Sequence, residues 1–155
     1  MAVELGQAAP EFELPASGGG RVKLSDFRDK RAVVVVFHPF AYTAVCQGEL
    51  CQLRDDLGAF EASGAQVVAI SCDSVFAQER WAEEQGFTFP VLSDFWPHGH
   101  VARAYGAFNE ALGCANRATY VVDTAGRVVA AFASADLGTP RARADYHAAL
   151  ARLAA

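Results

Sequence analysis

The residue in the best position for chemistry is Cys46, which lies in the first turn of a helix predicted from about Thr43 to Ser63. Unpaired backbone N–H groups and the positive end of the helix dipole meet in that turn, and both stabilise a thiolate. The thiolate is the nucleophilic form of cysteine, so the position favours nucleophilic thiol chemistry. Thr43 can turn its hydroxyl toward the same amides and the sulfur, and Pro39 forms a rigid apolar wall that limits water. The segment therefore predicts a thiol active site.

Reduction of a peroxide needs such a thiolate, donors that hold the two oxygens, and a positive charge that stabilises the departing oxygen. Thr43 and the helix amides can act as donors, whereas the cation must come from elsewhere in the chain. Pro39, Thr43 and Cys46 match the Pro-x-x-x-Thr-x-x-Cys motif of the peroxiredoxins. Arg117, at the entry to a predicted late strand, occupies the place of that family's catalytic arginine. The sequence thus resembles a peroxiredoxin.

The resemblance runs from the N-terminus to the last helix and is most specific for the alkyl hydroperoxide reductase E type, a one-cysteine peroxiredoxin of actinobacteria. The segments that carry it are 46–50, 86–90, 93–99 and 105–110. It implies a thioredoxin-like fold and a homodimer that reduces hydrogen peroxide and organic hydroperoxides with no metal, haem, flavin or nucleotide cofactor. It also implies a sulfenic acid on Cys46, which a thioredoxin- or mycoredoxin-like protein or a low-molecular-weight thiol then reduces.

The resemblance further assigns roles to two side chains around the sulfur. Arg117 would stabilise both the Cys46 thiolate and the leaving oxygen. An acid at the position of Glu49 helps to orient the arginine in the family, and a solvated surface glutamate is the alternative for this residue.

Two positions depart from the family pattern. Ala44 stands where many peroxiredoxins have proline, which loosens the loop but removes no catalytic group. Cys51 has no counterpart in the E type, but a cysteine five residues after the attacking one is the resolving cysteine of the bacterioferritin-comigratory (Q-type) peroxiredoxins. Cys51 is therefore either a resolving thiol or a core residue.

A disulfide between Cys46 and Cys51 would require the helix to open. Five residues of intact helix place the two Cα atoms about 8–9 Å apart, whereas a disulfide needs them within about 7 Å. We therefore predict local unfolding of the first helical turns after Cys46 becomes a sulfenic acid.

The remaining candidates are weaker. Cys72 ends an apolar strand and is expected in the core, while Cys114, close to Arg117 in the chain, is a second candidate for a resolving thiol. His98 and His100 have no third ligand nearby in the chain, so no metal site is predicted. A thiol–disulfide oxidoreductase would need a Cys-x-x-Cys, which the sequence lacks. The alternative function is a non-enzymatic redox sensor that uses Cys46 and Cys51.

The elements that must position these residues can be read from the periodicity. Runs of apolar residues at 32–37 and 66–71 predict buried strands, and 118–122 with 128–132 predict a hairpin. Besides the helix at 43–63, helices are expected at 75–85, 101–105 and 140–153, the last with Thr139 as its cap. This order predicts an α/β fold with a mixed central sheet and helices on both faces.

Size and composition agree with one domain over residues 1–155, since 52% of the residues are apolar. The formal net charge of −5 and the absence of a basic cluster argue against a nucleic acid or an anionic membrane as partner. The longest apolar run, 32–37, is far too short to span a membrane. Residues 1–10 have no basic start, so no secretory signal is expected and the predicted location is cytoplasmic.

Overall fold

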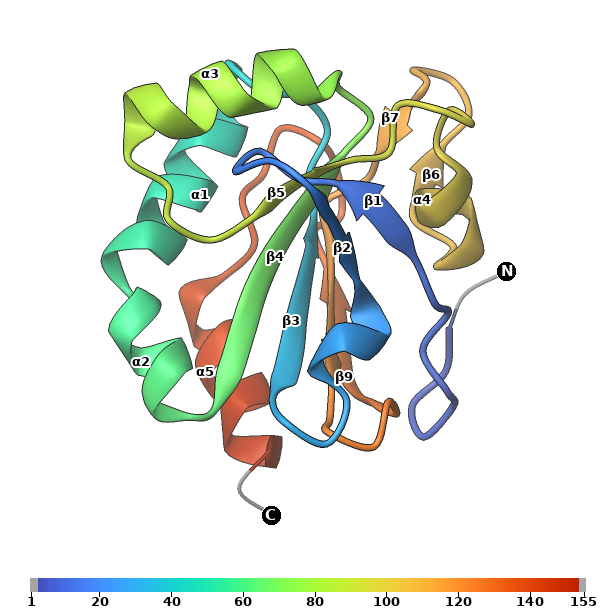
Figure 1. Cartoon of the computed structure of the whole chain (residues 1–155), viewed down its shortest axis with the longest axis vertical. Coiled ribbons are helices and arrows are strands. Elements are labelled where there is room, and N and C mark those ends of the chain that lie inside the picture. The colour runs from blue at the N-terminus through green and yellow to red at the C-terminus, as the bar shows by residue number, and fades with distance from the viewer. Residues whose placement is uncertain (1–2, 154–155) are drawn as a thin grey trace.

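The computed structural model describes residues 3–153, and its centre is a five-stranded sheet with the strand order β5-β4-β3-β8-β9 (Figure 1). The five strands are β3 (Ala32–Phe37), β4 (Ala65–Ser71), β5 (Val91–Ser93), β8 (Ala118–Val122) and β9 (Val128–Ala133). Strands β3, β4 and β5 are parallel to one another, whereas β8 is antiparallel to β3 and to β9. The predicted α/β fold with a mixed central sheet is confirmed. Met1 and Ala2, part of the segment in which no signal was expected, lie outside the described residues.

The central strand β3 separates two apolar clusters because its side chains alternate between the two faces of the sheet. Val33, Val35 and Phe37 join one cluster, while Val34 and Val36 join the other. All six residues of β3 are buried, which explains why the run is apolar throughout rather than alternating.

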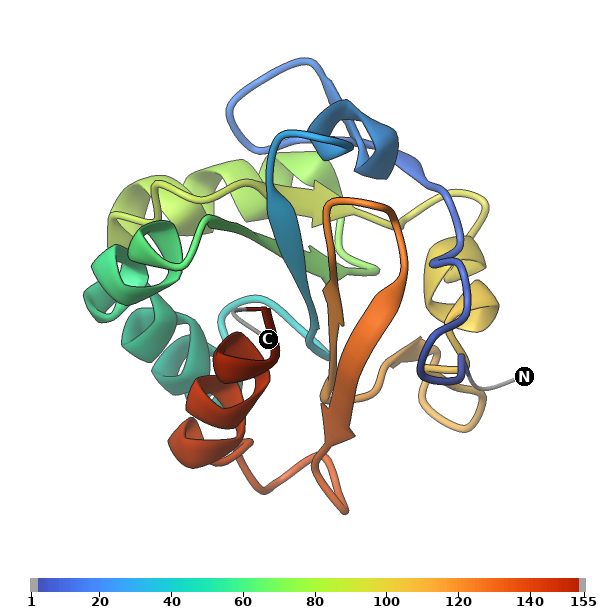
Figure 2. The ribbon, with the colours of Figure 1, turned by 90° about the horizontal axis from the view of Figure 1, so that it is seen from below.

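Helices cover both faces of the sheet, as predicted (Figure 2). One face is covered by α1 (Ala44–Asp55), α2 (Leu57–Ala62), α3 (Val75–Gln85) and α5 (Arg143–Leu153). The other face is covered by the N-terminal segment, the short 3-10 helix η1 (Leu24–Phe27) and α4 (His100–Ala104). Two small antiparallel pairs lie outside the main sheet, β1 (Glu13–Pro15) with β2 (Arg21–Lys23), and β6 (Phe108–Asn109) with β7 (Cys114–Ala115).

Two predicted helices differ from the structure. The helix expected over 43–63 is divided at Asp56, whose φ of −96° and ψ of 5° depart from helical geometry. The helix expected from Pro140 begins only at Arg143, and the side chain of Arg141 just before it is buried against the carbonyl of Phe37. By contrast, α3 has the predicted bounds, and Gly86 ends it with a φ of 69°.

Within residues 3–153, no helix combines the length and the apolar character needed to cross a membrane.

Candidate active site

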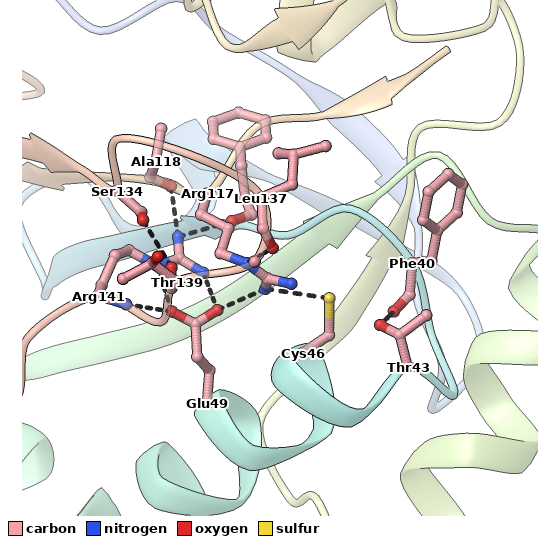
Figure 3. Close-up of polar contacts among 12 residues, drawn as sticks. Phe40, Thr43, Cys46, Glu49, Arg117, Ala118, Ser134, Leu137, Thr139 and Arg141 are labelled. Atoms are coloured by element: carbon pink, nitrogen blue, oxygen red, sulfur yellow. Dashed lines mark hydrogen bonds and ion pairs between the residues drawn. The ribbon is translucent and has the colours of Figure 1, made fainter. Parts of the chain in front are cut away.

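The sulfur of Cys46 lies 3.1 Å from Nη1 of Arg117, although 71 residues separate the two in the chain (Figure 3). Pairing between β3 and β8 explains this contact, because Phe37 is opposite Ala118 in the antiparallel register. Arg117, which precedes β8, therefore lies beside the loop of residues 38–43 that follows β3. Cys46 is fully buried in the first turn of α1, so the contact is shielded from solvent. The cation expected from elsewhere in the chain is thus in contact with the predicted nucleophile.

The guanidinium of Arg117 is held in place by two further acceptors. Its Nε donates to the backbone carbonyl of Leu137 at 2.7 Å, and its Nη1 donates to Oε1 of Glu49 at 2.8 Å. Arg117 is only 3% exposed. A fixed, desolvated guanidinium is a strong stabiliser of an adjacent anion, because its charge is not screened by water.

Glu49 is the centre of the buried charge cluster rather than a solvated surface residue. Its carboxylate also accepts Nη2, Nε and the backbone N–H of Arg141, at 2.8, 2.9 and 2.7 Å. Burial by itself would raise the pKa of Glu49, but hydrogen bonds from Arg141 and the positive charges of Arg141 and Arg117 lower it overall. Glu49 is therefore an anion that fixes the orientation of both arginines.

Arg141 is the residue of this cluster that the sequence did not reveal. Its other donors reach the carbonyls of Phe37 and Ala118 at 2.6 and 2.9 Å, so it links the ends of β3 and β8. The sequence pattern placed Arg141 in the first turn of a surface helix, where an arginine carries no signal of burial. Its pairing with the carboxylate of the buried Glu49 appears only in the tertiary structure.

Thr43 lies at the N-cap of α1, but its side chain does not behave as expected. The hydroxyl donates to the carbonyl of Phe40 at 2.8 Å and makes no hydrogen bond to the helix amides. The expectation that it folds toward the amides and the sulfur of Cys46 is therefore wrong, because the hydroxyl is turned to the carbonyl of Phe40 and accepts no bond from the first turn of α1. Pro39 is buried at the start of the same loop.

Comparison with known proteins agrees with this arrangement. Residues 5–131 match the AhpC/TSA family. Alkyl hydroperoxide reductase E of Mycobacterium tuberculosis is 48% identical over 124 residues, which cover 80% of this chain and 81% of the relative. The chain is a peroxiredoxin. It is a thiol-dependent peroxidase, as the resemblance implied.

Solved structures place the peroxiredoxin in the same fold. The crystal structure of peroxidoxin BcpB from Mycobacterium tuberculosis superposes with a TM-score of 0.85 at 33% identity, over 98% of this chain and 97% of the other. The crystal structure of Enterococcus faecalis AhpC superposes with a TM-score of 0.86 at 28% identity, over 97% and 92%. The predicted thioredoxin-like fold is confirmed.

The second cysteine of this peroxiredoxin faces away from the first. Cys51 is half-buried, and its sulfur lies 3.6 Å from Oε1 of Gln85 at the end of α3. The sulfur of Cys46, by contrast, points toward Arg117 at the edge of β8. The two thiols are therefore on different sides of α1, and both are free.

Cys72 and Cys114 are buried free thiols close to the site. Burial, with the negative charge of Asp94 as the next cause, raises the pKa of Cys72 to about 12. Burial also raises the pKa of Cys114, and a charge on Cys46 is the next cause. Cys72 is thus a protonated core residue, as predicted, and Cys114 lies within electrostatic reach of Cys46.

His38 follows β3 and is fully buried. Neither ring nitrogen has a hydrogen-bond partner among the described residues, and the ring packs against Trp81 with centroids 5.6 Å apart. Burial, with the charge of Arg141 as the next cause, lowers the pKa of His38 to about 3. The imidazole is therefore neutral at physiological pH.

Proposed function

We propose that Cys46 is the residue that attacks the peroxide and that Arg117 is its electrostatic partner. The observation that carries this proposal is the 3.1 Å contact between the sulfur of Cys46 and Nη1 of Arg117 in a fully buried site. The thiolate attacks one oxygen of the O–O bond, which breaks, and the other oxygen leaves as an alkoxide or hydroxide that takes up a proton. Cys46 is oxidised to a sulfenic acid, and the peroxide is reduced to an alcohol or water.

The charge cluster supports this assignment. Glu49 holds Arg117 from one side, and the carbonyl of Leu137 holds it from another, so the guanidinium is oriented before the peroxide arrives. An oriented charge needs no rearrangement when negative charge moves onto the departing oxygen. Amides of the first turn of α1 are the proposed donors to the peroxide, and Thr43 reaches it only if its hydroxyl leaves the carbonyl of Phe40.

The sulfenic acid is then reduced by a thiol. The thiol sulfur displaces the oxygen of the sulfenic acid, so that a disulfide forms and water is released. We propose that Cys51 supplies this thiol after α1 unwinds, because it is less buried than Cys114, the other candidate, and only five residues from Cys46 in the chain. A thioredoxin- or mycoredoxin-like protein, or a small thiol, would then reduce this disulfide. The proposed location of the enzyme is the cytoplasm.

A homodimer and a single domain complete the proposal. One domain is supported by the two apolar clusters, which share the strands of a single sheet. The dimer is supported by exposed apolar side chains that follow the carboxyl ends of the parallel strands β3, β4 and β5. These side chains are Phe40, Tyr42, Phe76, Phe95 and Trp96. Light scattering coupled to size exclusion would measure the mass of the assembly in solution.

The test of the assignment is mass spectrometry of the reduced protein after one equivalent of hydrogen peroxide. The variants are Cys51→Ser and Cys114→Ser. A Cys46–Cys51 disulfide in the parent protein, replaced by a sulfenic acid on Cys46 in Cys51→Ser, is the expected result. A disulfide that disappears only in Cys114→Ser would assign resolution to Cys114 instead. An unreacted Cys46 would contradict the whole assignment.

A further inference from the structure

The loop between β3 and α1, residues 38–43, leads into the helical turn that holds the buried sulfur of Cys46. Cys46 has no exposed surface in this conformation. A thiol that attacks the sulfenic acid needs access to this sulfur, and movement of the loop and of the first turn of α1 would provide it. The strength with which the loop is held closed therefore affects the two halves of the catalytic cycle differently.

One long-range hydrogen bond holds this loop at its middle. The backbone N–H of Ala41 donates to Oδ2 of Asp73 at 2.8 Å, across 32 residues of sequence. Asp73 lies just after the end of β4, the strand that runs parallel to β3. Its backbone carbonyl in turn accepts the hydroxyl of Ser93 at 2.6 Å, which ties it to β5. The loop is thus anchored to the adjacent strands through one carboxylate.

The carboxylate is itself oriented by a buried chain of donors. Gln78 is fully buried, and its Nε2 donates to the hydroxyl oxygen of Ser71 at 2.8 Å. The hydroxyl of Ser71 then donates its proton to Oδ2 of Asp73 at 2.6 Å. Because Ser71 already accepts from Gln78, its proton is directed to Asp73. This leaves Oδ2 as a fixed acceptor for the N–H of Ala41.

The neighbouring residue shows why the loop needs an anchor. Tyr42 has a φ of 66°, a left-handed conformation that is unfavourable for a residue with a large side chain. Such a conformation persists only when surrounding contacts impose it. The hydrogen bond at Ala41 lies directly before Tyr42, and the bond from Thr43 to Phe40 spans it.

We propose that Asp73 is a positioning residue that sets the balance between the closed and the open active site. With the N–H of Ala41 bound, the loop is closed and Cys46 stays against Arg117, ready for the peroxide. Without that bond, the strained loop opens more often and the sulfenic acid becomes accessible to thiols. This inference rests on the proposed role of Cys46. It predicts that loss of the bond slows the reaction with peroxide and accelerates the reduction of the sulfenic acid by a thiol.

The test compares Asp73→Ala with Asp73→Asn, both in a Cys51→Ser/Cys114→Ser background so that neither candidate resolving thiol competes with the added thiol for the sulfenic acid. The amide oxygen of asparagine can still accept the N–H of Ala41, whereas alanine offers no acceptor. The rate of peroxide reaction is measured by stopped-flow tryptophan fluorescence. The rate of sulfenic acid reduction is measured with the coloured thiol 2-nitro-5-thiobenzoate.

For Asp73→Ala we expect the peroxide reaction to slow by roughly tenfold and the thiol reaction to accelerate, since one hydrogen bond to a charged acceptor is lost. Asp73→Asn should restore both rates to within about twofold of the background protein. Ser63→Ala serves as the control, because it removes an exposed hydroxyl that donates to the carbonyl of Ala59, away from the loop; it should change neither rate by more than about twofold.

Three results would overturn the proposal. Both rates could fall together in Asp73→Ala, which would indicate general loss of structure, and circular dichroism and thermal unfolding would show this directly. Both rates could stay unchanged. Asp73→Asn could match Asp73→Ala, which would assign the effect to charge rather than to the anchor. A background protein whose Cys46 does not react with peroxide would instead refute the proposed function.

Discussion

Arg141 donates three hydrogen bonds to the carboxylate of Glu49, although 92 residues separate the two in the chain. Both side chains are almost completely buried. This pair also holds Arg117, because the carboxylate of Glu49 accepts a hydrogen bond from Nη1 of Arg117. Arg117 is thus oriented by a carboxylate that a second arginine holds in place.

Replacement of Arg141 by methionine should destabilise the protein by about 3–5 kcal/mol, because it leaves the buried charge of Glu49 with one partner instead of two. Urea unfolding measures this change. Arg143→Met is the matched control, since Arg143 is half-exposed and pairs with Asp56 at the surface. Its expected cost is below about 1 kcal/mol. Equal losses in the two variants would contradict the central role of Arg141.

Arg117→Lys should slow the reaction of Cys46 with peroxide by about 100-fold, which is typical when one oriented donor to a developing anion is lost. Lysine keeps the charge but cannot bind the sulfur, Glu49 and the carbonyl of Leu137 with one planar group. Stopped-flow fluorescence measures the rate. Arg31→Lys, in which an exposed arginine bound to Gln66 is changed, should react normally. A rate within about threefold of the parent for Arg117→Lys would show that charge alone suffices.

His38 should make the folded state less stable as the pH falls from about 6.5 toward 3. Its pKa is about 3 in the folded protein and about 6.5 when unfolded, so the unfolded state binds the proton first. In this window the free energy of unfolding should fall by at most about 1.4 kcal/mol per pH unit from this residue. Urea unfolding of the parent and of His38→Phe, measured at several pH values, isolates this contribution. Parallel curves for the two proteins would show that His38 does not titrate in this way.

Cys72 should be the slowest of the four thiols to react with iodoacetamide at pH 8. Its pKa of about 12 leaves almost no thiolate, and the side chain is buried. Cys51, which is half-buried, should react before Cys72 and Cys114. Timed alkylation of the reduced protein followed by peptide mass spectrometry gives the order. Early labelling of Cys72 would mean that the end of β4 opens far more readily than its packing indicates.

Local signals in the sequence determined the parts of this protein that depend on neighbouring residues. The valine run of β3 and the turn before β9 each act over a few residues, so they predicted these elements closely. The Pro-x-x-x-Thr-x-x-Cys spacing and the family resemblance pointed to Pro39, Thr43, Cys46 and Arg117.

Tertiary structure decided the contacts between distant segments. The burial of Glu49, the role of Arg141 and the anchoring of Ala41 by Asp73 all depend on which strand ends lie side by side. The helix expected over 43–63 is divided at Asp56, which its periodicity did not reveal. An arginine or an aspartate has no periodicity that reveals its distant partner, so these relationships appear only when β3, β4 and β8 are assembled.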